Sequence, residues 1–164
     1  MPLLKDGALI ADDWAQPAED EALPQDRPAF VSLERWRKER DSLAGRNAKL
    51  GLKLKSDQSP AELGEDVHRF AAIAFEFPRF NDGRAFSYAR VLRERMGYKG
   101  EIRALGPVIM DQYLLLKRCG FDTVEVKDGT DPKQWEAALG AFSRVYQPTG
   151  DGRPVIGALR HPRG

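Results

Sequence analysis

Residues 71–87 read AAIAFEFPRFNDGRAFS, and this stretch decides the fold of the chain. Its first part, Ala71–Phe77, is almost entirely apolar, which is typical of a strand covered on both faces. The loop that follows contains an Asn-Asp-Gly turn, and a helical pattern runs from Tyr88 to Met96. The stretch therefore predicts a buried strand, a sharp loop and the start of a helix.

Strand and helix patterns alternate on both sides of this stretch. They are predicted, in order, as a strand at Phe30–Val31, a helix from Ser32 to about Gly45, a strand at Leu50–Lys55, a helix from the Ser59-Pro60 capping box, a strand at Glu101–Leu105, a helix at Val108–Cys119, a strand at Thr123–Val126, a helix from Asp131-Pro132 and a strand at Arg144–Gln147. This order indicates an α/β fold with a mostly parallel sheet flanked by helices. An open, doubly wound sheet suits 164 residues better than a closed barrel of about 250, and a partial, barrel-like arrangement stays open as an alternative.

The same patterns predict a single α/β domain over residues 29–147. Residues 1–28 are expected to form an N-terminal extension, with a short strand at Ala8–Trp14 and then an acidic loop that contains prolines. Residues 148–164 contain several glycines and are expected to form a flexible tail.

Composition and charge narrow the class of protein. The net charge is +1, from 26 basic and 25 acidic residues that are mixed along the chain. Neither nucleic-acid binding nor membrane binding is expected from such a balance. The N-terminus lacks the pattern of a signal peptide, and no apolar run is long enough to span a bilayer. The single cysteine, Cys119, cannot form an internal disulfide, which fits a reducing cytoplasm.

The loop of residues 78–87 is the first candidate for a functional site. In open parallel sheets, ligands bind outside the carboxyl ends of the strands, where four loops are expected to lie: residues 56–58, 79–87, 106–112 and 127–131. The loop of residues 79–87 is the richest of them in polar and charged side chains. Free N–H groups at a helix start attract anions, and an arginine there adds charge and paired donors. We therefore expect a ligand- or anion-binding site made of Arg79, Asn81, Asp82, Gly83, Arg84 and Ser87. The alternative is structural: Asn81 or Asp82 caps the helix, and Arg84 pairs with Asp82.

Asp111 and Gln112 are the second candidates, because they are polar residues near the start of an otherwise apolar helix. They are expected either to point toward the same strand ends or to supply a dipole-favoured carboxylate and a solvent-facing amide. Cys119 lies at the C-terminal end of the same helix, where the dipole disfavours a thiolate, so we expect a buried core residue there. Gly120 is expected to end this helix in the left-handed conformation.

Known catalytic signatures are absent from the sequence. It has no dinucleotide fingerprint, phosphate-binding loop or nucleophile elbow. Two isolated histidines, His68 and His161, argue against a metal site or a histidine-based triad. The residues therefore predict no metal, and they identify neither a cofactor nor a catalytic residue.

Several stretches resemble a bacterial family, domain-of-unknown-function family 934. Residues 77–87 are similar to its FPKFTDGRGYS type of motif, with Ala85-Phe86 where that motif often has Gly-Tyr. Residues 92–101, Asp111-Gln112 and residues 118–122 also agree, and the likeness covers roughly residues 30–147. Members are commonly described as oxidoreductases involved in sulfite reduction, because their genes occur beside those of sulfate assimilation. The resemblance implies a cytoplasmic role in assimilatory sulfur metabolism, with sulfite reductase or another sulfate-assimilation enzyme as the partner.

Two hypotheses follow from the residues and the resemblance together. The first is an accessory protein of sulfite reduction that binds an anion, a cofactor or the reductase at the carboxyl ends of the strands. The second is an oxidoreductase whose cofactor is bound by an unrecognised motif. The missing dinucleotide fingerprint, cysteine pair and metal cluster favour the first hypothesis.

Overall fold

A seven-stranded sheet forms the centre of the computed structural model, which describes residues 1–79, 81–140, 149 and 155–156. The strands are β1 (Leu3–Lys5), β2 (Ala8–Ile10), β3 (Ala29–Ser32), β4 (Leu50–Leu54), β5 (Ala72–Glu76), β6 (Glu101–Leu105) and β7 (Thr123–Glu125). Their order in the sheet is β2-β1-β7-β6-β5-β4-β3. Strands β3 to β7 are parallel to one another, whereas β1 pairs antiparallel with β7 and with β2. The predicted α/β fold with a mostly parallel sheet is confirmed.

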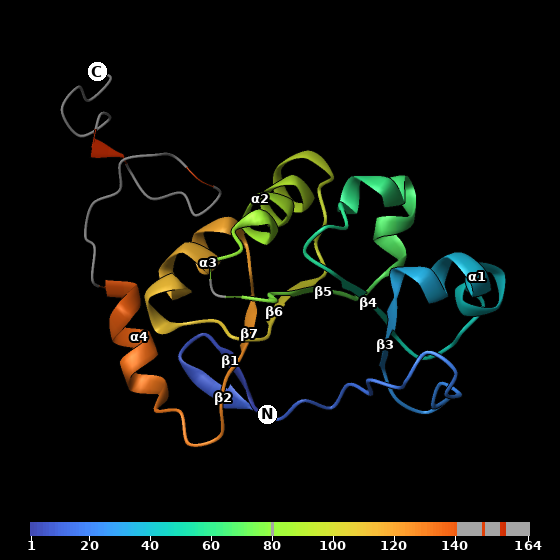
Figure 1. Ribbon diagram of the computed structural model, residues 1–164, viewed down its shortest axis with the longest axis horizontal. Coiled ribbons are helices and arrows are strands. Elements are labelled where there is room, and N and C mark those ends of the chain that lie inside the picture. Colours follow the sequence, from blue (N-terminus) through green and yellow to red (C-terminus); the bar gives the residue numbers. More distant parts are fainter. Residues whose placement is uncertain (80, 141–148, 150–154, 157–164) are drawn as a thin grey trace.

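The helices connect neighbouring strands one after another. They are α1 (Leu33–Ala44), the 3₁₀ segment η1 (Pro60–Arg69), α2 (Arg84–Arg90) with its π-helical continuation η2 (Val91–Arg95), η3 (Met110–Gln112), α3 (Tyr113–Cys119) and α4 (Pro132–Gly140). From β3 to β7, each connection leads to the next strand in the same direction along the sheet. Because such crossovers are right-handed, their helices lie on one face of the sheet, as Figure 1 shows. In a doubly wound sheet, the strand order changes direction at one point. Strands β3 to β7 follow one another without such a change, so the structure has the partial, barrel-like arrangement.

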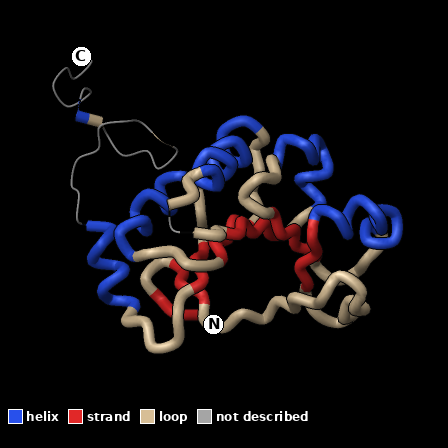
Figure 2. The backbone as a smooth tube through the Cα atoms, in the orientation of Figure 1, coloured by secondary structure: helices blue, strands red, loops and turns tan. Residues whose placement is uncertain are grey.

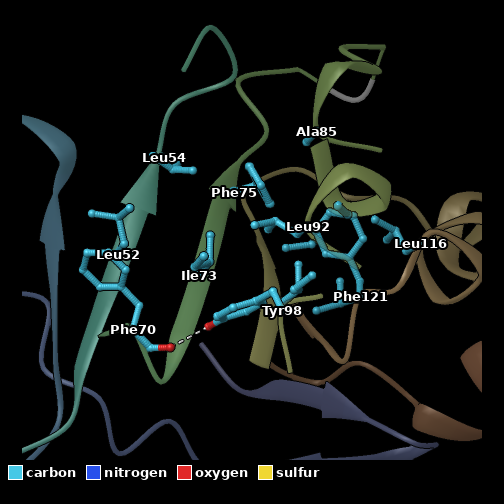
Figure 3. Close-up of a cluster of buried hydrophobic side chains, with 14 of the residues drawn as sticks. Leu52, Leu54, Phe70, Ile73, Phe75, Ala85, Leu92, Tyr98, Leu116 and Phe121 are labelled. Carbon is cyan, nitrogen blue, oxygen red and sulfur yellow. Dashed lines mark hydrogen bonds between the residues drawn. The ribbon is translucent and has the colours of Figure 1, made fainter. Parts of the chain in front are cut away.

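The two faces of the sheet carry different side chains, because strand residues alternate. On the helix-covered face, Ile73 and Phe75 of β5 join the main hydrophobic core. Figure 3 shows them beside Leu52 and Leu54 of β4. On the opposite face, here called the inner face, Ala72 and Ala74 pack in a smaller cluster with Phe30, Leu105 and the partly buried Trp14. The sheet therefore has one thick hydrophobic layer under the helices and one small layer inside its curve.

An N-terminal strap, residues 11–16, closes the inner face. It follows the β1–β2 hairpin, which pairs with β7 at one side of the parallel strands. At the other side, the Ala15 N–H donates to the Pro28 carbonyl, and the Phe30 N–H donates to the Ala15 carbonyl, both at 2.9 Å. Figure 2 shows the strap running beneath the curved row of strands. The first 16 residues thus belong to the same sheet structure as the rest.

Several elements differ from their predicted form. The N-terminal strand ends at Ile10 instead of Trp14, because Asp12 and Trp14 turn toward a buried arginine on β6. The Ser59 cap does start a helical segment, but it is 3₁₀ in type and is broken at Gly64, where φ is +53°. Helix α2 begins at Arg84, before the predicted start. The predicted strand at Arg144–Gln147 and most of the expected tail lie outside the described residues. In the described part, no helix is both long and apolar enough to cross a membrane.

Candidate functional site

Three side chains meet at the carboxyl ends of β4 and β5. Ser56 follows β4, and Asp82 and Arg84 follow β5. Arg84 donates from Nη2 to Ser56 Oγ (2.8 Å) and to Asp82 Oδ2 (2.7 Å), and from Nε to Asp82 Oδ1 (3.0 Å). Parallel neighbouring strands end at the same edge of a sheet, which brings together residues 28 positions apart. We call this group the Ser56–Asp82–Arg84 cluster.

Asp82 organises the cluster locally. Its Oδ1 also accepts the backbone N–H of Arg84 at 3.3 Å, so its carboxylate turns the chain into α2. The guanidinium hydrogen bonds hold the pKa of the Asp82 carboxyl well below its usual range, and the carboxylate raises the pKa of Arg84. Of the alternatives considered for this loop, the pairing of Arg84 with Asp82 is present in the structure.

The pairing leaves part of the guanidinium available. Its Nε and Nη2 atoms are bonded, whereas Nη1 has no hydrogen-bond partner among the described residues. The Arg84 side chain is 54% exposed, while Ser56 is buried. Asp82 offsets the charge of Arg84, so the cluster offers a fixed set of N–H donors more than a net positive charge.

The other predicted residues surround the cluster without joining its hydrogen bonds. Arg79, Asn81, Gly83 and Ser87 are exposed on the loop and on the first turn of α2. Asp111 is exposed and Gln112 half-buried in η3, which follows β6. Within the described residues, no hydrogen bond or ion pair links Asp111 to Arg84. The structure thus brings together two of the predicted residues, Asp82 and Arg84, and adds Ser56.

A cavity at the mouth of the inner face was not predicted. It has a volume of about 340 Å³ and lies where β5, β6 and β7 end. Its walls include Glu76, Leu105 and Glu125 from these strands and Gln16 from the strap. Glu76 pairs with Lys53 of β4 at 3.3 Å, whereas no described residue forms a hydrogen bond or ion pair with the Glu125 side chain. The sequence does contain a signal for the position of Glu76. Because side chains alternate along a strand, Glu76 lies on the same face of β5 as Ala72 and Ala74.

A buried arginine deeper on the inner face was also missed. Arg103 of β6 is only 2% exposed and donates to Glu101 (3.0 Å) and to Asp12 of the strap (2.8 Å). Its guanidinium carbon lies 5.0 Å from the ring centre of Phe30 and 5.7 Å from that of Trp14. These contacts fix the strap against the sheet, so the role of Arg103 is structural.

A second network explains residues 92–101 and 118–122, two stretches that resembled the family. Arg93 of η2 donates to the carbonyls of Tyr98, Gly100 and Gly120 at 2.8–3.1 Å and to Asp122 Oδ2 at 2.6 Å. Gly120 ends α3 with φ +102°, as the sequence predicted. Arg93 therefore joins the ends of two helices.

Cys119 is buried, as predicted. Among the described residues, no group of three or more histidine, cysteine, aspartate or glutamate side chains is placed to hold a metal ion.

The family model for bacterial proteins of unknown function, DUF934, matches residues 51–156 of the chain. This range contains β4 to β7, the whole Ser56–Asp82–Arg84 cluster and the Arg93 network. A search of curated proteins and a search of solved structures each found no significant match.

Proposed function

Because the chain belongs to the DUF934 family of bacterial proteins of unknown function, we propose that it is an accessory protein of assimilatory sulfite reduction in the cytoplasm. In this role it binds an oxyanion, a cofactor or sulfite reductase itself at the carboxyl ends of the strands. The pathway rests on the resemblance to proteins described as taking part in sulfite reduction. The binding role rests on the site.

The observation that carries the binding role is the Ser56–Asp82–Arg84 cluster. Two loops that are distant in sequence hold one guanidinium by three hydrogen bonds, yet the side chain stays half-exposed. A guanidinium that is already oriented loses little conformational entropy when it binds a ligand. The two N–H groups of Nη1, which have no partner among the described residues, can donate to oxygen atoms of sulfite or sulfate, so an oxyanion is the ligand class that the cluster favours.

The cavity at the mouth of the inner face suits a different ligand. Glu76 is paired with Lys53, but the carboxylate of Glu125, which has no partner among the described residues, would repel an anion. We therefore assign the oxyanion to the Ser56–Asp82–Arg84 cluster and not to this cavity.

Spectroscopy and partner capture test the accessory role against the alternative, an oxidoreductase of sulfite reduction. The purified protein is expected to show no flavin or haem absorbance and no oxidation of NADPH with sulfite. Immobilised protein is expected to retain purified assimilatory sulfite reductase. A bound chromophore or turnover with sulfite would establish the oxidoreductase instead, and failure to retain the reductase would remove the reductase from the proposed ligands.

A further inference from the structure

A second cavity lies at the opposite edge of the sheet, by the amino ends of β6 and β7. Its volume is about 480 Å³, and its walls come from η2, the η2–β6 connection and the last turn of α3. We propose that this amino-end cavity binds a small organic anion, with the negative group at Lys99 and Lys117 and the organic part in the remaining volume of the cavity. This site is independent of the Ser56–Asp82–Arg84 cluster.

The acidic side chains in the cavity wall are already paired. Glu94 accepts two hydrogen bonds from Arg90, at 3.0 and 3.2 Å. Asp122 accepts from Arg93 at 2.6 Å and from the Ile102 N–H at 2.7 Å. Neither carboxylate is left with an unbalanced charge to repel an anion.

The negative ends of the adjoining helices are also neutralised. The carbonyl of Leu92 in η2 accepts the N–H of Tyr98 at 2.9 Å. The carbonyl of Leu116 accepts the N–H of Phe121 at 3.1 Å. Helix carbonyls that already accept hydrogen bonds oppose an anion much less than free ones.

Two lysines supply the positive charge that remains. The Lys99 ammonium has no hydrogen bond or ion pair within the described part of the chain, and its side chain is exposed. Lys117 donates to Asp6 Oδ1 at 2.9 Å, but the Asp6 side chain is 69% exposed. An exposed ion pair of this kind is worth little, so a bound anion can take the place of Asp6 at Lys117.

The size of the cavity favours a ligand that is larger than an inorganic ion. Tyr98, Cys119 and Phe121 lie under its floor, but each is at most 5% exposed, so they offer a ligand little contact area. A volume near 480 Å³ lies within the range of small-molecule sites, about 300–1,000 Å³. Sulfate would fill only a small part of this volume, whereas an aromatic sulfonate or carboxylate would fill more of it.

Benzenesulfonate is a suitable probe, followed by proton–nitrogen NMR of the full chain. Saturable shifts are expected at the amides of Gly120 and Asp122, and benzyl alcohol, which lacks the charge, is expected to cause none. Lys99→Met should weaken binding about twofold to fivefold, the loss typical of one exposed charge contact. Lys127→Met, at the carboxyl end of β7, is the matched control and should bind like the wild type.

Asp6→Asn gives the more discriminating result, because it should strengthen binding. It releases Lys117 from its carboxylate, and asparagine tolerates the φ of +46° at this position. Absence of saturable shifts, equal affinity in Lys99→Met, or weaker binding in Asp6→Asn would each overturn the proposal. The affinity measured from the shifts of Gly120 and Asp122 should be the same in Arg84→Ala, which separates this site from the oxyanion site, where a sulfonate can bind as well.

Discussion

Replacing Arg103 with methionine tests the closure of the inner face by the N-terminal strap. Arg103 is 2% exposed and bonds Asp12 of the strap and Glu101 of its own strand. Methionine keeps much of the side-chain volume but removes the charge and all the donors. Two carboxylates then lose the cation that balances them, and the strap loses its main contact with β6.

The size of the effect follows from these contacts. Removing one partner of a buried ion pair costs about 3–5 kcal/mol of the free energy of unfolding. Both carboxylates retain one other donor, since Glu101 accepts from the Thr123 hydroxyl and Asp12 from the Trp14 N–H. They are also partly exposed, so water can reach them. We therefore expect a loss of about 3 kcal/mol, at the lower end of that range.

Urea unfolding at pH 7, followed by circular dichroism, measures this loss. Asp12→Asn alone should cost about 1–2 kcal/mol. The double variant should cost less than the sum of the two single changes by at least about 1 kcal/mol, because the residues contact each other. Arg37→Met is the control, since its ion pair with Glu62 is exposed and worth under about 1 kcal/mol. A loss below about 1 kcal/mol for Arg103→Met, or additive single effects, would refute the role given to this residue.

Two further predictions concern the other arginine networks. Carbon NMR should place the titration midpoint of the Asp82 carboxyl below its ordinary pKa of 3.8, and Arg84→Ala should return the pKa toward that value. Because the folded-state pKa is lowered, this stabilisation is complete above the ordinary pKa and is lost as the pH falls through the folded-state pKa; an unshifted midpoint would contradict the pairing. Arg93→Met should lower the free energy of unfolding by about 2–4 kcal/mol, as four acceptors lose their donor. Arg95→Met, exposed on the same turn, should change it by under about 0.5 kcal/mol, and equal effects would contradict the role of Arg93 as the link between helices.

Local signals in the sequence predicted most of the elements. The Ser32 hydroxyl accepts the Arg35 N–H at 3.0 Å, as expected of an N-cap, and the helix ends at Ala44 beside Gly45. Gly120 takes the left-handed conformation predicted for the end of α3. Such caps depend on residues within one or two turns of the chain, so a single sequence is enough to recognise them.

The strand order and the strap depend on contacts between distant residues. Periodicity shows that strands and helices alternate, but it does not show which strands pair, so the doubly wound and the partial-barrel arrangements both remained open. Arg103 and Asp12 are 91 residues apart, and neither has a local pattern that indicates the partner. Only the three-dimensional structure shows that the N-terminal residues complete the sheet.

The candidate site was predicted as a loop but not as a cluster. Asp82 and Arg84 are two residues apart, and their pairing was one of the alternatives considered. The loop of residues 56–58 was expected at the same edge of the sheet, but Ser56 was not among the predicted site residues, because its contact with Arg84 requires that β4 and β5 be neighbours. The cavity beside Glu76 required the inner face to be recognised as closed by the strap, which the sequence did not show.

The central claim is that Arg84, oriented by Asp82 and Ser56, binds an oxyanion. A titration with sulfite at constant ionic strength, with chloride as the reference salt, measures it through the midpoint of thermal unfolding. We expect the midpoint to rise with sulfite in the wild type and to stay constant in Arg84→Ala. The same midpoint in sulfite and chloride, or an equal rise in Arg84→Ala, would contradict the claim.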